Sequence, residues 1–189
     1  MSSKLLVLLG ALIFSTASLA QVAPAGENNR INLSAGGGMD FMWGDWGNAI
    51  YRLGPSAWVS AEIWRGIGVN VEGHSMILTG PDPSAQFKYF SGQGGAMYTY
   101  HHWRKIRPFA KAEIGYASLT FPSTGLPYVH QDERIWEFGG GAEYRTWKRL
   151  WTRVDYSYDF FPNFYSPVTG EFHTLNPKGF AFGESYHFR

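Results

Sequence analysis

Apolar and polar residues alternate with a period of two over long stretches of this chain. The clearest runs begin at Ala57, Gly68, Pro108, Trp136 and Leu150. In each run, apolar or small residues fill one set of alternate positions, and polar or charged residues fill most of the other. Successive side chains of a β-strand point to opposite faces of a sheet. The pattern therefore predicts strands with one apolar and one polar face.

The connections between these runs alternate in length. Weaker runs at residues 31–41, 87–100 and 178–188 bring the expected number of strands to about eight. Short basic connections are expected at residues 64–66, 101–106 and 146–149, and longer ones rich in Gly, Pro, Asp or Asn at 40–48, 79–85, 121–133 and 162–176. Short turns on one side and long loops on the other are typical of an antiparallel up-and-down transmembrane β-barrel. We therefore predict an all-β fold of this kind.

The first twenty residues have the features of a cleaved secretory signal peptide. Residues 1–4 form a short start made basic by Lys4, residues 5–14 are apolar, and Ser18 and Ala20 are small residues before an expected cut at Gln21. The apolar segment is shorter than the ~20 residues that a transmembrane helix needs. We expect a signal peptide at residues 1–20, a short lead-in at 21–29 and one barrel domain at 30–189.

Composition narrows the possible partners. The chain has 16 Lys+Arg and 15 Asp+Glu, and Lys4 is the only charge before Gln21, so the exported part is neutral. A neutral protein lacks the basic face that nucleic acid requires. With no cysteine, the chain can form neither disulfides nor a lipid anchor on an N-terminal cysteine. No segment after Ala20 is apolar for long enough to form a transmembrane helix.

The alternation leaves two readings, because either water or lipid could contact the apolar face. Aromatic residues near the strand ends favour lipid, since such rings form girdles at both membrane interfaces. The expected girdle comprises Trp64, Trp103, Trp147, Trp151, Phe160 and Phe161. Ordinary strand aromatics are the alternative explanation. A soluble lipocalin-like carrier, suggested only by Gly44-Asp45-Trp46, is the alternative fold.

The polar face carries charges that could pair inside the barrel. The expected lumenal network comprises Glu62, Glu72, Lys111, Glu113, Glu137, Glu143, Arg145, Arg153, Asp155 and Asp159. An eight-stranded barrel has an interior just wide enough for side chains to fill. We therefore predict a plug of ion pairs, with Gly139 and Gly141 making room for long neighbours. A proton or ion pathway, or a narrow porin for small solutes, is the alternative.

The last strand carries a more specific signal. Residues 179–188, GFAFGESYHF, resemble the closing strand of bacterial outer-membrane barrels, whose terminal aromatic is read by the barrel-insertion machinery. With the signal peptide and the glycine-rich run at 138–144, the chain resembles the outer-membrane β-barrel family, similar to the OmpA-like transmembrane domain. Tyr186 and Phe188 would carry the insertion signal. Arg189 after Phe188 departs from the family pattern.

The resemblance implies a monomer in the cell outer membrane with no cofactor. Its partners would be outer-membrane lipid and lipopolysaccharide, the insertion machinery and periplasmic chaperones. The implied function is non-enzymatic, in envelope structure or in surface interaction through the extracellular loops. One residue does not fit the expected arrangement of apolar residues facing lipid and charged residues facing the lumen. Glu184 lies at the same alternate positions as Phe182 and Tyr186, which would face lipid. We expect a local bulge to turn Glu184 inward.

Some small outer-membrane barrels are lipid A deacylases or acyltransferases, which makes an enzyme the main functional alternative. Such chemistry needs a His base, a Ser nucleophile and an orienting acid. His130 with Glu133, and His173 with Glu171 and Ser166, supply those residue types in or near long loops. We predict no catalytic site. We also expect no metal site, since the adjacent His101 and His102 would point to opposite faces of a strand.

Overall fold

The computed structural model describes residues 31–44, 51–78, 87–121, 129–165 and 172–188, and these contain nine strands. The strands are β1 (Asn32–Trp43), β2 (Tyr51–Trp64), β3 (Ile67–Leu78), β4 (Phe87–Thr99), β5 (Ile106–Phe121), β6 (Val129–Arg145), β7 (Leu150–Tyr165), β8 (Phe172–Leu175) and β9 (Lys178–His187). In the described ranges, no helix has the length and apolar character needed to cross a membrane. The expected signal peptide and lead-in lie outside the described residues.

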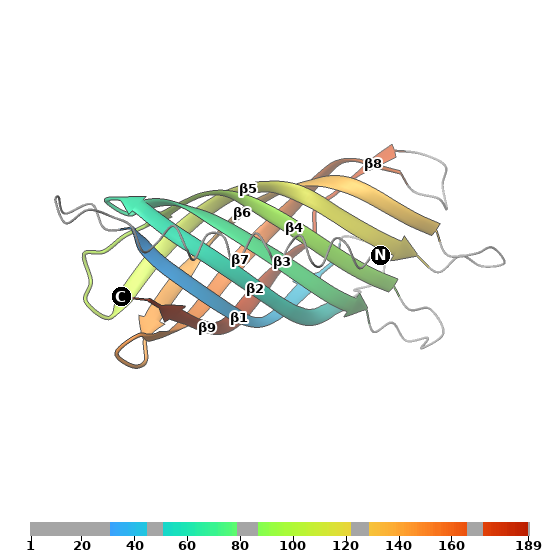
Figure 1. Ribbon diagram of the computed structural model, residues 1–189. Coiled ribbons are helices and arrows are strands. Elements are labelled where there is room, and N and C mark those ends of the chain that lie inside the picture. Colours follow the sequence, from blue (N-terminus) through green and yellow to red (C-terminus); the bar gives the residue numbers. More distant parts are fainter. Residues whose placement is uncertain (1–30, 45–50, 79–86, 122–128, 166–171, 189) are drawn as a thin grey trace, which may run out of the picture. The chain divides into compact units, whose positions relative to one another are not determined.

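Eight of these strands form a closed antiparallel barrel (Figure 1). Each strand from β1 to β6 pairs with the next along the chain, and β9 closes the ring by pairing with both β7 and β1. The short β8 pairs with the end of β7, with a register irregularity between Phe161 and Phe164. The predicted fold, an up-and-down barrel of about eight strands, is confirmed.

The short connections lie at one end of the barrel, together with the end of β9. The β2–β3 hairpin turns at Arg65 and Gly66, whose φ angles are 48° and 88°. Two positive φ angles in succession match the tight two-residue turns that suit the twist of paired strands. At the opposite end, β1, β3, β5 and β7 end before residues 45–50, 79–86, 122–128 and 166–171, which lie outside the described residues.

The interior is polar toward the short turns and apolar toward the other end. Along β7, for example, Arg153 and Asp155 are buried while Val154 and Tyr156 are exposed. Toward the long connections, the interior is instead filled by a hydrophobic cluster. The cluster comprises Met42, Met76, Tyr89, Ala117, Leu119, Ile135, Phe161, Phe164 and Leu175. The polar lumen was expected from the sequence, but this apolar cluster was not.

Candidate functional site

Lys111 lies at the centre of the buried charges. It projects from β5, and its side chain is 1% exposed. Its Nζ contacts a carboxylate oxygen of Glu72 on β3, and lies 2.6 Å from Glu137 Oε1 on β6. Asp155 Oδ2 on β7 is 3.8 Å away. One ammonium group therefore links four strands of the barrel.

Arg153 provides the second buried cation. Its Nε and Nη2 donate to Asp155 Oδ2 at 2.9 and 2.7 Å, and Nη2 lies 3.5 Å from Glu72 Oε2. The guanidinium also stacks over the rings of Trp58 and Phe109, at 4.7 and 4.5 Å from their centroids. Such stacking on aromatic faces is favoured by a planar cation. Glu72 thus contacts both Lys111 and Arg153.

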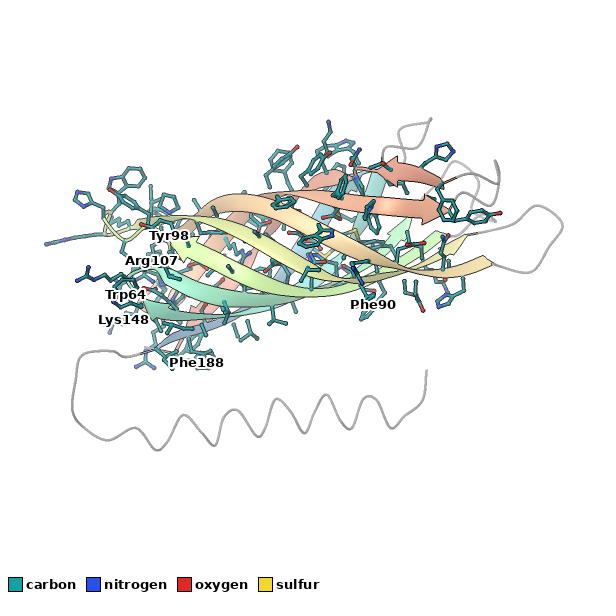
Figure 2. All side chains as sticks on the ribbon, turned by 90° about the horizontal axis from the view of Figure 1, so that it is seen from above. Trp64, Phe90, Tyr98, Arg107, Lys148 and Phe188 are labelled. Carbon is teal, nitrogen blue, oxygen red and sulfur yellow. The ribbon has the colours of Figure 1, made fainter. Side chains whose placement is uncertain are left out.

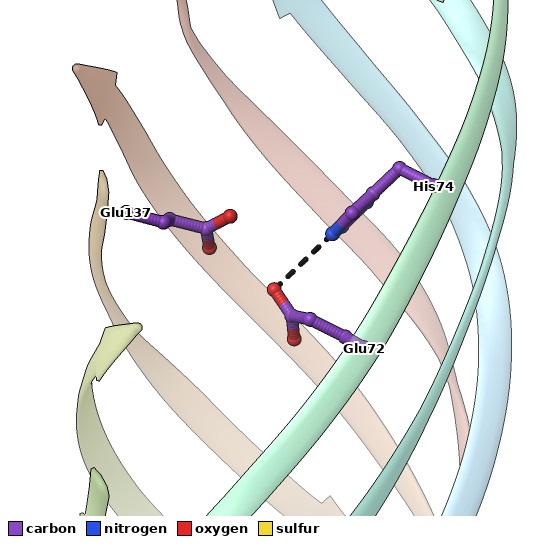
Figure 3. A group of neighbouring side chains, drawn as sticks. All are labelled: Glu72, His74 and Glu137. Carbon is purple, nitrogen blue, oxygen red and sulfur yellow. Dashed lines mark hydrogen bonds and ion pairs between the residues drawn. The ribbon is translucent and has the colours of Figure 1, made fainter. Parts of the chain in front are cut away.

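A histidine extends the network toward the apolar cluster, and Figure 3 shows this residue, His74, beside Glu72. His74 follows Glu72 by two residues on β3, so both side chains point inward. His74 Nδ1 lies 2.6 Å from Asp40 Oδ2, and Nε2 lies 3.2 Å from Glu72 Oε1. Gln93, which faces Glu72 in the β3–β4 register, donates through its amide to Glu72 and Glu137.

The network continues to the short-turn end. Asn70 Nδ2 donates to Glu72 Oε2 and to Glu113 Oε1, both at 2.8 Å. Glu143 Oε2 lies 3.1 Å from His187 Nε2. At the mouth, Glu62 accepts from the Gly66 backbone N–H and lies 2.7 Å from His101 Nε2. Polar side chains therefore fill the interior from Lys111 to the short-turn mouth.

A search of known families gives the decisive observation. Residues 6–188 match the family described as outer membrane protein beta-barrel domain. This chain belongs to that family. The resemblance inferred from the sequence is confirmed, and the protein resides in the cell outer membrane. Among curated protein sequences, none matches the chain.

Solved outer-membrane barrels share the fold at low sequence identity. Neisserial surface protein A superposes with a TM-score of 0.65 at 14% identity, covering 84% of this chain and 97% of that one. OprG from Pseudomonas aeruginosa gives 0.60 at 11% identity, covering 86% and 98%. Ail, the attachment invasion locus protein of Yersinia pestis, gives 0.54 at 14% identity, covering 86% and 100%. The solved structures therefore agree with the closed barrel described above.

The structure brings together most of the charged residues that the sequence placed in the lumen of this outer-membrane barrel. Eight of the ten are buried: Glu72, Lys111, Glu113, Glu137, Glu143, Arg153, Asp155 and Asp159. Glu62 is only partly buried at the mouth. Arg145 is exposed and donates to the backbone carbonyls of Trp147 and Lys148. The prediction that Arg145 belongs to the network was wrong, because β6 ends at this residue and the Arg145 side chain bonds to the adjacent turn.

Sequence reasoning left Asp40, Asn70, His74, Gln93 and His187 out of the network. Asp40 was assigned to a loop, but β1 continues past it to Trp43 and Asp40 is 2% exposed. It accepts from Ser56 Oγ at 2.7 Å and contacts His74. His187 was placed in the last strand without a partner, and it pairs with Glu143. The parity that this residue shares with Ser185 could have indicated its inward position.

The aromatic residues expected at the membrane interfaces divide into two groups. Trp64, Trp103 and Trp147 are exposed at the short-turn end, and Phe160 is half-buried (Figure 2 labels Trp64). Trp151 and Phe161, however, are 3% and 1% exposed. Their assignment to the girdle was wrong, because both share the inward parity of Arg153. Trp151 instead lies under the Arg107 guanidinium, whose carbon is 4.1 Å from the ring centroid.

Glu184 faces outward, contrary to the expected bulge. The pairing of β9 with β1 and with β7 runs without a register shift through Glu184. Its carboxylate is exposed and accepts from Thr152 Oγ1 at 2.7 Å. Thr152 is only two residues from the start of β7, so Glu184 lies near the short-turn end of the barrel. There a carboxylate is much less unfavourable than at mid-bilayer.

The candidate catalytic residues do not assemble as the enzyme alternative requires. His130 and Glu133 have opposite parity on β6, and Glu133 accepts from Gln131 Nε2 at 2.6 Å. Ser118 Oγ lies 3.2 Å from His130 Nε2, but the Asp132 carboxylate approaches that same nitrogen, at 3.5 Å. A triad needs the acid on the other nitrogen, where Thr120 lies instead. Residues 166 and 171 of the second candidate group lie outside the described residues.

Proposed function

We propose that this outer-membrane barrel is non-enzymatic and that ion pairs close its lumen. In this proposal it contributes to envelope structure or to surface interaction through its extracellular loops. The observation that carries the proposal is the set of buried contacts around Lys111 and Arg153. These two cations reach Glu72, Glu137 and Asp155 from strands on different sides of the interior. Side chains thereby occupy the path that an ion would need.

The space left in the lumen supports a closed barrel. A cavity of about 20 Å³ lies at the short-turn mouth between Glu62, Arg107, Glu143 and His187, which is enough for about one water molecule. A second hollow beside Asp40 and His74 has no room for water. Beyond it lies the hydrophobic cluster, which offers an ion no hydrogen-bonding groups to replace its water shell.

Conductance across a planar bilayer tests the closed state. We expect the purified barrel to show no large and stable open states. The double variant Lys111→Ala with Arg153→Ala should open more often, because it removes two long side chains that cross the lumen. Lys148→Ala, which removes a charge from an exposed turn, is the matched control. Large and stable openings of the unaltered protein would contradict the plug and favour a narrow porin.

The orientation in the membrane belongs to the same proposal. The described short turns contain Arg65, Arg104, Lys105, Lys148 and Arg149, and Figure 2 shows Lys148, Trp64 and Phe188 at this end of the barrel. We assign this end to the periplasm and the long connections to the cell surface, as in other outer-membrane barrels. Protease treatment of intact cells should cleave within residues 45–50 or 122–128 and spare the short turns.

Lipid A chemistry is the alternative that one contact favours. Ser118 Oγ and His130 Nε2 lie 3.2 Å apart on the outward side of β5 and β6. Mass spectrometry of lipid A from expressing and non-expressing cells tests this alternative. We expect identical acylation patterns. A pattern that changes with expression and reverts in Ser118→Ala would replace the non-enzymatic proposal.

A further inference from the structure

His74 is held in the orientation of a metal-binding imidazole. Asp40 Oδ2 lies 2.6 Å from Nδ1, so the aspartate fixes the ring and leaves Nε2 directed toward Glu72. Metal-binding histidines commonly have such a carboxylate on the second nitrogen. Asp40 and His74 are 2% and 8% exposed, and therefore both are shielded from solvent.

Two carboxylates converge on the same point (Figure 3). Glu72, His74 and Glu137 each place one donor atom within 4.8 Å of the other two. Glu72 and His74 share one face of β3, and Glu137 extends toward them from β6. One imidazole nitrogen and two carboxylate oxygens form a donor set suited to divalent first-row transition metals, including Zn²⁺.

A buried amide supplies an independent indication. Gln93 is 5% exposed, and its amide nitrogen faces Glu72, His74 and Glu137. Its Oε1 is buried and forms no hydrogen bond with the described residues. Gln93 Oε1 is one of seven such buried atoms among the described residues, and it belongs to the amide that faces the three donor side chains. Rotating the amide by 180° would direct Oε1 at the three donors and make it a fourth ligand.

The buried charges also favour an additional cation. Among the described interior residues, seven buried carboxyl groups face two permanent cations, Lys111 and Arg153, and two histidines. The carboxyl groups belong to Asp40, Glu72, Glu113, Glu137, Glu143, Asp155 and Asp159. Even with His74 and His187 both protonated and the half-buried Arg107 counted beside Glu143, ionised carboxylates would exceed cations by two. Buried charges require compensation.

We propose that Glu72, His74, Glu137 and Gln93 bind one divalent transition-metal ion, for which Zn²⁺ is the probe. Each carboxylate offers about four lone-pair positions. Lys111 can therefore keep its contacts with Glu72 and Glu137 while the metal uses other lone pairs. This site goes beyond the proposed function, because metal binding is measured separately from conductance. A bound ion would join β3, β4 and β6 inside the barrel.

Titration of the purified protein tests the site. The full barrel in detergent is stripped with EDTA, dialysed and titrated with Zn²⁺ in a calorimeter. We expect one Zn²⁺ per chain with a Kd of about 10 μM or lower. Absence of saturable binding up to about 100 μM would overturn the proposal. Heat-modifiable gel migration verifies that every sample is folded.

Two conservative variants identify the ligands. His74→Gln and Glu137→Gln keep the side-chain size and remove one metal ligand each, so each should weaken Zn²⁺ binding at least about tenfold. His187→Gln is the matched control, because it alters the other buried histidine, which pairs with Glu143. Its affinity should be unchanged. Unaltered binding in His74→Gln, or an equal loss in His187→Gln, would overturn the assignment.

X-ray absorption of the zinc-loaded wild type needs no variant. The spectrum should fit one imidazole nitrogen and two or three oxygens at about 2.0 to 2.2 Å. A first shell with two or more imidazoles would place the metal elsewhere and reject this site.

Discussion

Arg153 illustrates how one residue can hold several parts of the lumen together. It is 2% exposed, ion-pairs with Asp155 and Glu72, and stacks on Trp58 and Phe109. A buried cation of this kind is costly to desolvate, and its partners become costly when it is removed. The contribution of Arg153 to stability is therefore measured best as the loss in the free energy of unfolding when this residue is replaced.

Replacing Arg153 by methionine should lower the free energy of unfolding by about 3–5 kcal/mol, because two buried carboxylates lose their guanidinium. Urea-induced unfolding in phospholipid vesicles, followed by tryptophan fluorescence, measures the change. Lys148→Met, at an exposed turn, should stay within about 0.5 kcal/mol of the wild type. Similar losses in both variants would show that the ion pairs do not stabilise the barrel.

Gly139 makes room for the stem of Lys111. A Cβ at this position would lie 2.7 Å from Lys111 Cε and 3.0 Å from the Tyr156 carbonyl oxygen. Gly139→Ala should therefore cost about 1–3 kcal/mol in the same unfolding assay, through displacement of Lys111. Gly92, whose added Cβ would meet no atom within 4 Å, is the matched site. An equally destabilising Gly92→Ala would point to backbone effects instead.

At the residue scale, the sequence predicted the direction of a side chain more accurately than the residue at which a strand ends. Parity placed Glu72 and Lys111 on the polar faces of their strands, since every second side chain of a strand faces the same way. The aromatic residues near the strand ends then indicated that these polar faces line the interior. Parity failed for Asp40 and Arg145, because the point at which a strand stops depends on pairing with its neighbours. The contacts between residues distant in the chain, such as Asp40 with His74, depend on register and could not be predicted.

The strands were predictable as elements because each carries its own alternation. The number of barrel strands and their antiparallel order follow from that pattern and from the connection lengths. The β8 segment was not predicted, since its four residues are too few to show a period of two. Nor could the sequence show that β9 continues through Glu184 without a bulge, because Thr152 of the neighbouring strand supplies the compensating hydrogen bond.

The closing strand allows a test of the proposed insertion signal. Tyr186 and Phe188 are 42% and 55% exposed, with ring centroids 5.3 Å apart. Phe188→Ala should reduce the folded, heat-modifiable fraction in outer membranes several-fold, while refolding of the purified chain in detergent stays unchanged. Phe90→Ala, at an equally exposed aromatic on β4, is the control. Equal losses in cells would assign the effect to lipid contact rather than to recognition.

The whole molecule inverts the usual distribution of polarity. Its exposed surface includes Val59, Val71, Ile114 and Phe182, while charged residues such as Glu72, Lys111 and Arg153 are buried. A water-soluble protein rarely exposes so many large apolar side chains. The inversion follows from the bilayer as solvent, which the family assignment now establishes.

The depth of two positions in the bilayer can be tested by placing the same side chain, arginine, at each of them. Val71, near the middle of β3, is 60% exposed, and Ile67, at its start, is 49% exposed. Val71→Arg should destabilise the barrel in vesicles by about 2–4 kcal/mol, and Ile67→Arg by about 0–1 kcal/mol. Equal costs at both positions would contradict a membrane midplane near Val71.

The closure of the ring by β9 has a consequence for the order of folding. Lys111 and Glu72 are 39 residues apart, and Arg153 and Glu72 are 81 apart, so no single hairpin contains these ion pairs. A chain that lacks its final strand would leave the interior open and its charges hydrated. Burial of the charges therefore occurs together with the last pairing step, which should make assembly an all-or-none event with few stable intermediates.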